Sequence, residues 1–174
     1  MSDQSHYKVF VVDDDQMQSE MIVDQIKKQS SFEVISFSNG KDCLKNLHLN
    51  PNIVVLDYQL DTQDQTALDG LDVLQEIKKT LPDSEVIMFS GQEKIEVAVN
   101  TMKYGAFDYI VKGESAFHRL ENTMINILRK FKLTKQAKVY RKLSLSLGIV
   151  LIVMIFVIMI LFQQGAITAN PGWM

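Results

Sequence analysis

Short runs of apolar residues recur along the chain, and longer segments with helical spacing separate them. Five of these runs predict β-strands, at residues 8–12, 32–37, 52–57, 84–90 and 107–112. The first, third and fourth runs are almost continuously apolar, which is typical of strands buried on both faces of a parallel sheet. The pattern therefore predicts an α/β domain with a five-stranded parallel sheet.

The segments between the strands carry apolar side chains three or four positions apart, which predicts amphipathic helices that connect one strand to the next. These helices are expected at residues 16–29, 39–49, 68–81 and 94–105. A fifth helix is expected to begin near Ser115. No proline and only one glycine, Gly148, occur between Ser115 and Phe162, so this helix is predicted to have no internal end before Phe162.

A block of 20 residues, 143–162, contains no charged side chain and is apolar on all faces from Ile149 onward. As a helix, the block would be about 30 Å long, which is the thickness of the hydrocarbon core of a bilayer. A domain of this size cannot surround such a helix. The block therefore predicts a transmembrane helix rather than a buried core helix or strand.

Charge is distributed unevenly along the chain. Residues 1–121 contain 11 Lys and Arg against all 21 Asp and Glu, and the other seven Lys and Arg residues lie between positions 129 and 142. By the positive-inside rule, this basic flank keeps residues 1–142 in the cytoplasm and sends the C-terminus outside. We expect the flank to bind anionic lipid of the inner leaflet, or to act only as a topogenic signal, and not to bind nucleic acid.

Residues with chemically useful side chains follow four of the predicted strands. They are the acids Asp13, Asp14 and Asp15 after the first strand, Asp57 at the end of the third, Ser90 at the end of the fourth and Lys112 at the end of the fifth. Ligand sites in open parallel sheets lie at the carboxyl ends of the strands. Clustered carboxylates suit Mg²⁺, and a hydroxyl with a lysine can stabilise a phosphoryl group on one of them.

Four motifs in this order, VVDDD, VVLDYQLD, VIMFSG and DYIVKG, resemble those of the response-regulator receiver domains of two-component signalling. The resemblance covers about residues 7–131. It implies a doubly wound, five-stranded, flavodoxin-like α/β fold. It also implies a phosphoacceptor rather than an enzyme, with at most intrinsic self-phosphorylation and autodephosphorylation.

Carried over residue by residue, the resemblance implies a phosphoacceptor and a Mg²⁺ site. Asp57 would accept the phosphoryl group and contribute to Mg²⁺ binding. Asp14 would bind Mg²⁺ directly, Asp13 would act chiefly through water, and Gln59 would offer its backbone carbonyl. Asp15 is expected to be only a cap or first-turn residue of the first helix, where acids favour the helix dipole.

The resemblance also implies a switch. Ser90 and Lys112 would stabilise the phosphoryl group, and Tyr109 would be the aromatic residue whose rotamer follows Ser90. Two features depart from the family pattern: Gly113 stands where proline is usual after the lysine, commonly with a cis peptide, and the loop at residues 60–70 is longer than usual. The extra acids of that loop, Asp61 and Asp64, are expected to tune access to Asp57.

Two alternatives stay open from the residues alone. A haloacid-dehalogenase-type hydrolase could use Asp13, Asp15, Ser90 and Lys112, but it would leave Asp57 without a task. A phosphorylation-independent pseudo-receiver, acting as a membrane-tethered interaction scaffold, is favoured by the departures at Gly113 and in the loop. The complete set of acids, serine and lysine argues against the pseudo-receiver.

The expected organisation has five parts: an N-terminal tail (1–6), a receiver domain (7–131), a basic juxtamembrane stalk (132–142), a transmembrane helix (143–162) and a short non-cytoplasmic tail (163–174). The phosphoryl donor would be a histidine kinase or phosphotransfer protein. The output would be a phosphorylation-dependent contact between the domain's own surface and an unknown downstream or membrane protein. Homodimerisation through the weak small-residue motif Ser144-x-x-x-Gly148 is a further expectation.

Overall fold

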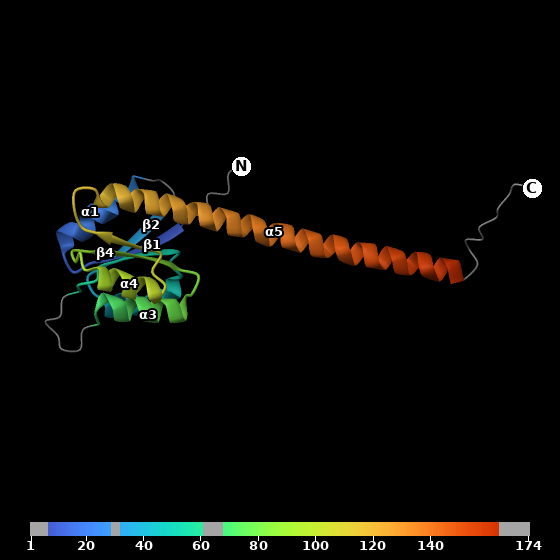
Figure 1. Ribbon diagram of the computed structural model, residues 1–174, viewed down its shortest axis with the longest axis horizontal. Coiled ribbons are helices and arrows are strands. Elements are labelled where there is room, and N and C mark those ends of the chain that lie inside the picture. Colours follow the sequence, from blue (N-terminus) through green and yellow to red (C-terminus); the bar gives the residue numbers. More distant parts are fainter. Residues whose placement is uncertain (1–6, 29–31, 61–67, 164–174) are drawn as a thin grey trace, which may run out of the picture. The chain divides into compact units, whose positions relative to one another are not determined.

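The structure is a computed structural model of the 174-residue chain, and it describes residues 7–28, 32–60 and 68–163. Two compact units, Met1–Ile127 and Leu128–Met174, divide the chain. The strands are β1 (Tyr7–Val12), β2 (Phe32–Phe37), β3 (Ile53–Leu56), β4 (Glu85–Ser90) and β5 (Asp108–Val111) (Figure 1). The helices are α1 (Gln16–Lys27), α2 (Gly40–Lys45), the 3₁₀ helix η1 (Leu47–Leu49), α3 (Gly70–Thr80), α4 (Ile95–Lys103) and α5 (Ala116–Gln163).

The five strands form one parallel sheet in the order β2-β1-β3-β4-β5. This is the doubly wound, flavodoxin-like arrangement that the sequence predicts, and each predicted strand is within one residue of the observed strand at both ends. The chain reverses its direction of winding at β1, which has β2 on one side and β3 on the other. The carboxyl ends of β1 and β3 therefore meet at the switch point, where ligand sites of such sheets lie.

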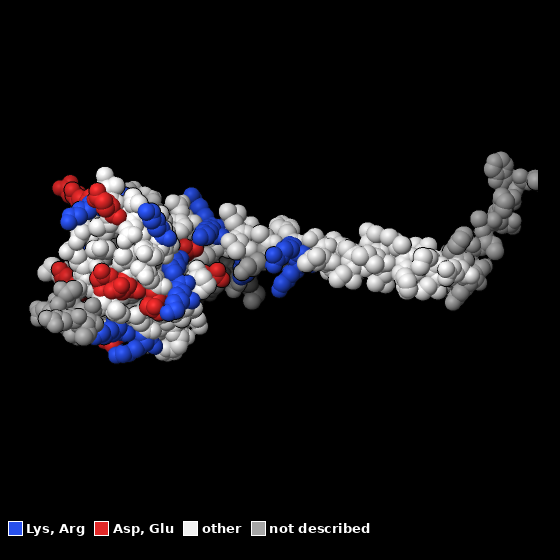
Figure 2. All heavy atoms as spheres, turned by 60° about the horizontal axis from the view of Figure 1, so that its bottom comes forward, with Lys and Arg blue, Asp and Glu red and all other residues white. Residues whose placement is uncertain are grey.

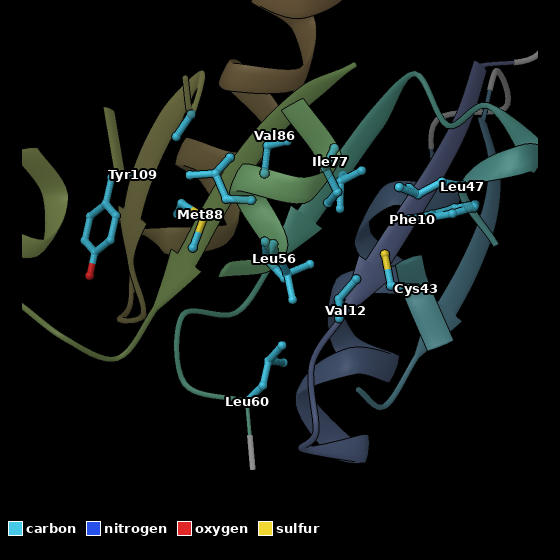
Figure 3. Packing of buried hydrophobic residues seen from close by; sticks show 14 residues of the cluster. Phe10, Val12, Cys43, Leu47, Leu56, Leu60, Ile77, Val86, Met88 and Tyr109 are labelled. Atoms are coloured by element: carbon cyan, nitrogen blue, oxygen red, sulfur yellow. The ribbon is translucent and has the colours of Figure 1, made fainter. Parts of the chain in front are cut away.

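The central strands supply the core of the first unit. The side chains of β1 from Val9 onward, of β3 and of β4 are buried, as continuously apolar runs between two helical layers should be. Figure 3 shows Leu56 and Met88 of the sheet together with Ile77 of α3, and Phe10 together with Cys43 and Leu47. Cys43 is the only cysteine of the chain, and its burial raises the pKa of the thiol to about 12.

The first turns of α5 are packed against the domain through one face. Leu120, Met124 and Ile127 recur at helical spacing and are fully buried. On β5, the carboxylate of Asp108 accepts hydrogen bonds of 2.8 Å from Nη2 of Arg119 and from Oγ1 of Thr123. These contacts, apolar and polar together, fix the start of α5 beside β5.

The later part of α5 has a different character. Every side chain that the structure describes from Leu143 to Leu161 is exposed, and the helix reaches a mean hydropathy of 3.0 over 18 residues. In Figure 2 this part of the helix carries neither blue nor red side chains. By length and composition, α5 is therefore able to cross a membrane, and the helix runs without a break to Gln163.

Candidate functional site

A buried ion-pair cluster occupies the switch point of the sheet. Val12 of β1 is in register with Leu56 of β3, so the residues that follow them, Asp13 and Asp57, lie side by side. The backbone N–H of Asp57 donates to the carbonyl of Val12 at 2.8 Å, which fixes this position. Both side chains are buried, Asp13 being 2% and Asp57 6% exposed. The register of two strands thus brings together carboxylates far apart in sequence.

Lys112 reaches both of these carboxylates. Its backbone N–H donates to the carbonyl of Ser90 at 2.8 Å, which extends the pairing of β4 with β5 by one residue. Its Nζ lies 2.7 Å from Oδ2 of Asp57 and 3.1 Å from Oδ2 of Asp13. One ammonium group therefore neutralises two buried acids only in part.

A third carboxylate completes the acidic cluster. Ligand oxygens of Asp13, Asp14 and Asp57 all lie within 4.8 Å of one another, and Asp14 is exposed to solvent. Gln59 adjoins the cluster, and its backbone N–H donates to Oδ1 of Asp57 at 3.2 Å. Hard carboxylate oxygens with one exposed ligand position fit Mg²⁺, which binds one or two carboxylates and keeps part of its water shell. The donor set therefore suits the metal that the sequence predicts.

The electrostatics of the cluster follow from burial. Loss of water raises the pKa of Asp13, and the hydrogen bond and charge of Lys112 oppose that rise only in part, while Asp57 adds to it. For Lys112, burial lowers the pKa, but the hydrogen bond and charge of Asp57, together with those of Asp13, outweigh burial and leave the pKa raised. Lys112 therefore stays charged at neutral pH, whereas the ionised form of Asp13 is held at a cost.

Ser90 and Tyr109 are joined through a third residue, Gln92. Ser90 is completely buried, and its Oγ accepts a 3.1 Å hydrogen bond from the backbone N–H of Gln92. Tyr109 is only 7% exposed, and its hydroxyl donates to the backbone carbonyl of Gln92 at 2.8 Å. Because Gln92 takes part through its backbone alone, no side-chain pattern could have pointed to it.

Gly70 is a second residue that sequence reasoning missed. Its backbone N–H donates to the carbonyl of Tyr58 at 3.0 Å, at the start of α3. A Cβ at this position would collide with the carbonyl oxygen of Asp57 and lie 2.6 Å from Cα of Tyr58. The absence of a side chain at Gly70 therefore lets α3 begin directly under the backbone of Asp57. An Asp-Gly pair at a helix start is only a weak sequence signal for such a close approach.

The neighbouring predictions have mixed outcomes. Asp15 is the N-cap of α1, as expected, because its carboxylate accepts from the backbone N–H groups of Met17 at 2.9 Å and Gln18 at 3.2 Å. The peptide between Lys112 and Gly113 is trans. A Cβ at Gly113 would meet nothing within 4 Å, so the loop does not require glycine there for space. Asp61 and Asp64 lie outside the described residues.

Residues 9–124 match the family of response regulator receiver domains. The chain belongs to this family. Membership decides against the haloacid-dehalogenase alternative and places the protein in two-component signalling, where receiver domains receive phosphoryl groups from histidine kinases or phosphotransfer proteins.

Individual relatives differ in length from this receiver protein. The putative response regulator NtrX-like of Rickettsia conorii is 38% identical over 109 residues, which are 62% of this chain and 22% of that protein. The chain thus spans about a fifth of the NtrX-like relatives. The chemotaxis protein CheY of Listeria monocytogenes is 35% identical over 116 residues, 66% of this chain and 92% of that protein.

Solved structures agree with the fold of the receiver. The crystal structure of the receiver domain of NtrX from Brucella abortus has a TM-score of 0.62 and 31% identity, covering 70% of this chain and 98% of that one. The signal receiver domain of a putative LuxO repressor protein from Vibrio parahaemolyticus has a TM-score of 0.67, with 76% of this chain and 97% of that one covered, at 22% identity. Because its identity is only 22%, the LuxO receiver structure supports the fold alone.

Proposed function

We propose that this receiver accepts a phosphoryl group on Asp57 from a histidine kinase or a phosphotransfer protein and signals through a phosphorylation-dependent protein contact. The observation that carries the proposal is the bridge from Nζ of Lys112 to Asp57 at 2.7 Å and to Asp13 at 3.1 Å. This bridge brings a nucleophilic carboxylate, a second acid and a cation together at one sheet edge.

The transfer needs little covalent chemistry from the protein. An oxygen of Asp57 attacks the phosphorus of a phosphohistidine, the P–N bond breaks, and the imidazole keeps the bonding electron pair. Lys112 then exchanges a carboxylate oxygen for a phosphoryl oxygen. The hydroxyl of Ser90 accepts from Gln92 and donates to no described residue, so its proton is available for another phosphoryl oxygen.

We assign Mg²⁺ to the carboxylates of Asp13, Asp14 and Asp57 and to the backbone carbonyl of Gln59. When bound, the metal neutralises part of the negative charge of the acids and of the incoming phosphoryl group. Asp14 is exposed, so its carboxylate can exchange contact with water for contact with the metal at little cost. Asp13 is buried beside Asp57 and holds the charge that the cation balances.

The output path in this proposal runs through Gln92. If Ser90 turns toward the phosphoryl group, the hydrogen bond between Ser90 and the backbone N–H of Gln92 is lost. The same peptide segment holds the hydroxyl of Tyr109 through the carbonyl of Gln92. A shift there alters the start of α4 and the position of the Tyr109 ring, and so changes the surface formed by α4, β5 and α5.

We also propose that the apolar part of α5 is a single transmembrane anchor, with the receiver in the cytoplasm and the C-terminus outside. Support comes from the exposed apolar side chains between Leu143 and Leu161 and from the seven Lys and Arg residues at 129–142. That basic segment would contact anionic lipid of the inner leaflet, at about 1 kcal/mol for each cation near the surface.

The decisive test is phosphorylation of the purified full-length chain. A small phosphodonor such as acetyl phosphate, with Mg²⁺, should add the mass of one phosphoryl group in intact-protein mass spectrometry. The variant Asp57→Ala should lose the adduct, and the control Asp83→Ala, at an exposed acid after α3, should keep it. No adduct with any donor would favour the pseudo-receiver scaffold instead.

A further inference from the structure

Exposed side chains of α5 recur with a period of seven residues in the second compact unit. One set, between 39% and 70% exposed, consists of Leu133, Tyr140, Leu147, Met154 and Leu161. A second exposed set follows four residues after each of the first four members and consists of Ala137, Ser144, Leu151 and Ile158. Such alternating spacings of four and three residues define the a and d positions of a coiled coil. We call these two sets together the α5 seam.

The cations of the basic stalk lie outside the seam. Between residues 132 and 142 the chain has five Lys and Arg residues, which occupy positions b, c, e and f of the repeat but neither a nor d. Arg141 stands at e, and the facing g position of a parallel second helix would be Gln136. The side-chain carbonyl of glutamine can accept a hydrogen bond from a guanidinium. Two parallel helices could therefore meet in the stalk without like charges across the seam.

The seam is also suited to close packing where the stalk meets the apolar block. Ser144 donates from its Oγ to the backbone carbonyl of Arg141 at 3.1 Å, so a second helix could enclose this side chain without leaving its hydroxyl donor unpaired. Ala137 and Ser144 are small and stand on either side of Tyr140 in the repeat. Small residues at a helix interface allow two backbones to approach closely.

Lipid cannot cover the first part of the seam if residues 143–162 span the bilayer as proposed above. Leu133 precedes Leu143 by ten residues, which is about 15 Å along a helix. The headgroup layer is only about 5–8 Å thick on each side of the hydrocarbon core. Leu133, 65% exposed, would therefore stand in water, and another helix could remove it from water. Because a single-span anchor gives every copy the same orientation, a second copy offers the same seam in parallel.

We propose that the α5 seam pairs with the seam of a second copy of this chain, as a parallel, in-register, two-stranded coiled coil that begins at Leu133. Each a or d side chain then packs beside its own counterpart. The inference rests on the proposed anchor for its parallel orientation and does not depend on phosphorylation of Asp57. It differs from pairing through Ser144 and Gly148, because Gly148 stands at position e, beside the seam.

Cysteine cross-linking in intact cells that express the full-length chain tests the seam. Leu133→Cys, Ala137→Cys and Tyr140→Cys, treated singly with a short membrane-permeant bismaleimide, should each give a dimer band in denaturing electrophoresis with immunoblotting. Val139→Cys is the matched control, because Val139 adjoins Tyr140 and is 58% exposed. It stands at position c, which faces away from the partner, so it should give roughly fivefold less dimer. The native chain, in which Cys43 is buried, should give none.

Two further changes, each made in the Ala137→Cys chain, identify which face is used. Tyr140→Lys places like charges opposite each other at a d position and should lower the dimer yield by about fivefold or more. Val139→Lys adds the same charge outside the seam and should leave the yield unchanged. Gly148→Leu should also leave it unchanged, whereas pairing through Ser144 and Gly148 would not tolerate the larger side chain.

Cross-linking at the three seam positions with little at Val139, and equally in the Asp57→Ala background, supports the proposal. Three results would overturn it: no dimer at any seam position, equal yields at Tyr140 and Val139, or loss of the dimer in Gly148→Leu. Fractionation of the same cells reports on the anchor separately. A membrane-bound chain without the cross-linking pattern contradicts the seam alone, and a soluble chain that keeps the pattern contradicts the anchor alone.

Discussion

The ammonium nitrogen of Lys112 lies 2.7 Å from Oδ2 of Asp57, although 55 positions separate the two residues in sequence. The same nitrogen is shared with Asp13 at 3.1 Å, so one buried cation serves two buried acids. Such a cluster is not arranged for maximal stability, because removal of water from the acids is compensated only in part. The consequences can be measured.

The first prediction concerns Asp13→Asn in the absence of Mg²⁺. Burial raises the pKa of Asp13 in the folded state, so its contribution to stability is fully present below the unfolded pKa, near 3.8, and is lost as pH rises through the raised folded value. Asparagine resembles the neutral acid and has no such loss. The variant should therefore be more stable than the wild type at pH 7, where the ionised form of Asp13 is held at a cost.

Thermal or urea unfolding of the full-length protein in detergent, followed by circular dichroism, measures this difference. The gain of the variant over the wild type should shrink as pH falls toward 4. A gain that is the same at both pH values would contradict the assignment of the cost to ionised Asp13.

The second prediction separates two adjacent acids. Asp15→Ala removes the N-cap contacts to Met17 and Gln18 and should cost about 1 kcal/mol of unfolding free energy, with Mg²⁺-dependent phosphorylation preserved. Asp14→Ala should leave stability almost unchanged, because Asp14 is exposed, and should abolish the phosphoryl adduct. If unfolding and intact-mass measurements show that both variants behave alike, the division of roles is wrong.

The third prediction tests the close approach of α3 to the phosphoacceptor. Gly70→Ala would force apart the start of α3 and the backbone of Asp57 and Tyr58. We expect a loss of roughly 1–3 kcal/mol, which is typical of an overpacked site, and slower phosphorylation by acetyl phosphate.

Gly113→Ala is the matched control for Gly70→Ala, because a Cβ at Gly113 meets nothing within 4 Å. It should change neither unfolding nor phosphorylation. Equal effects of the two substitutions would show that the contact at Gly70 is not what holds Asp57 in place.

The fourth prediction concerns the anchor. Deletion of residues 143–174 should release the protein from membranes to the soluble fraction and leave phosphorylation of Asp57 intact. The first compact unit ends at Ile127, well before the deletion, so the fold of the receiver should survive. Cell fractionation with immunoblotting measures the release. Persistent membrane association of the truncated chain would place the anchor elsewhere.

The strands and helices were predictable because each carries its own local signal. The runs that became β1, β3 and β4 are almost continuously apolar. A strand between two helical layers is buried on both faces, so apolar side chains are favoured at successive positions. The meeting of Asp13 and Asp57 was predictable from the same pattern, since polar residues that end neighbouring parallel strands share one edge. Asp15 as a cap followed from its position before an amphipathic segment.

The features that escaped prediction depend on backbone contacts across the fold. Gln92 acts through its N–H and its carbonyl, which every residue except proline possesses. Gly70 matters through the side chain that it lacks, and the atoms it approaches belong to Asp57 and Tyr58. At Gly113 the family pattern has proline, commonly with a cis peptide, whereas this chain has a trans peptide and open space around the glycine.

The burial of Cys43 has a practical consequence for topology. A thiol that is completely enclosed and has its pKa raised to about 12 is almost entirely protonated at neutral pH and is inaccessible to alkylating reagents. We therefore expect the native chain not to react with maleimides in its folded state, so single cysteines can be introduced without first removing Cys43. A reporter thiol introduced at Ser144 or at Gln163, labelled with a membrane-impermeant maleimide in intact cells, reports the side on which each end of the apolar segment lies.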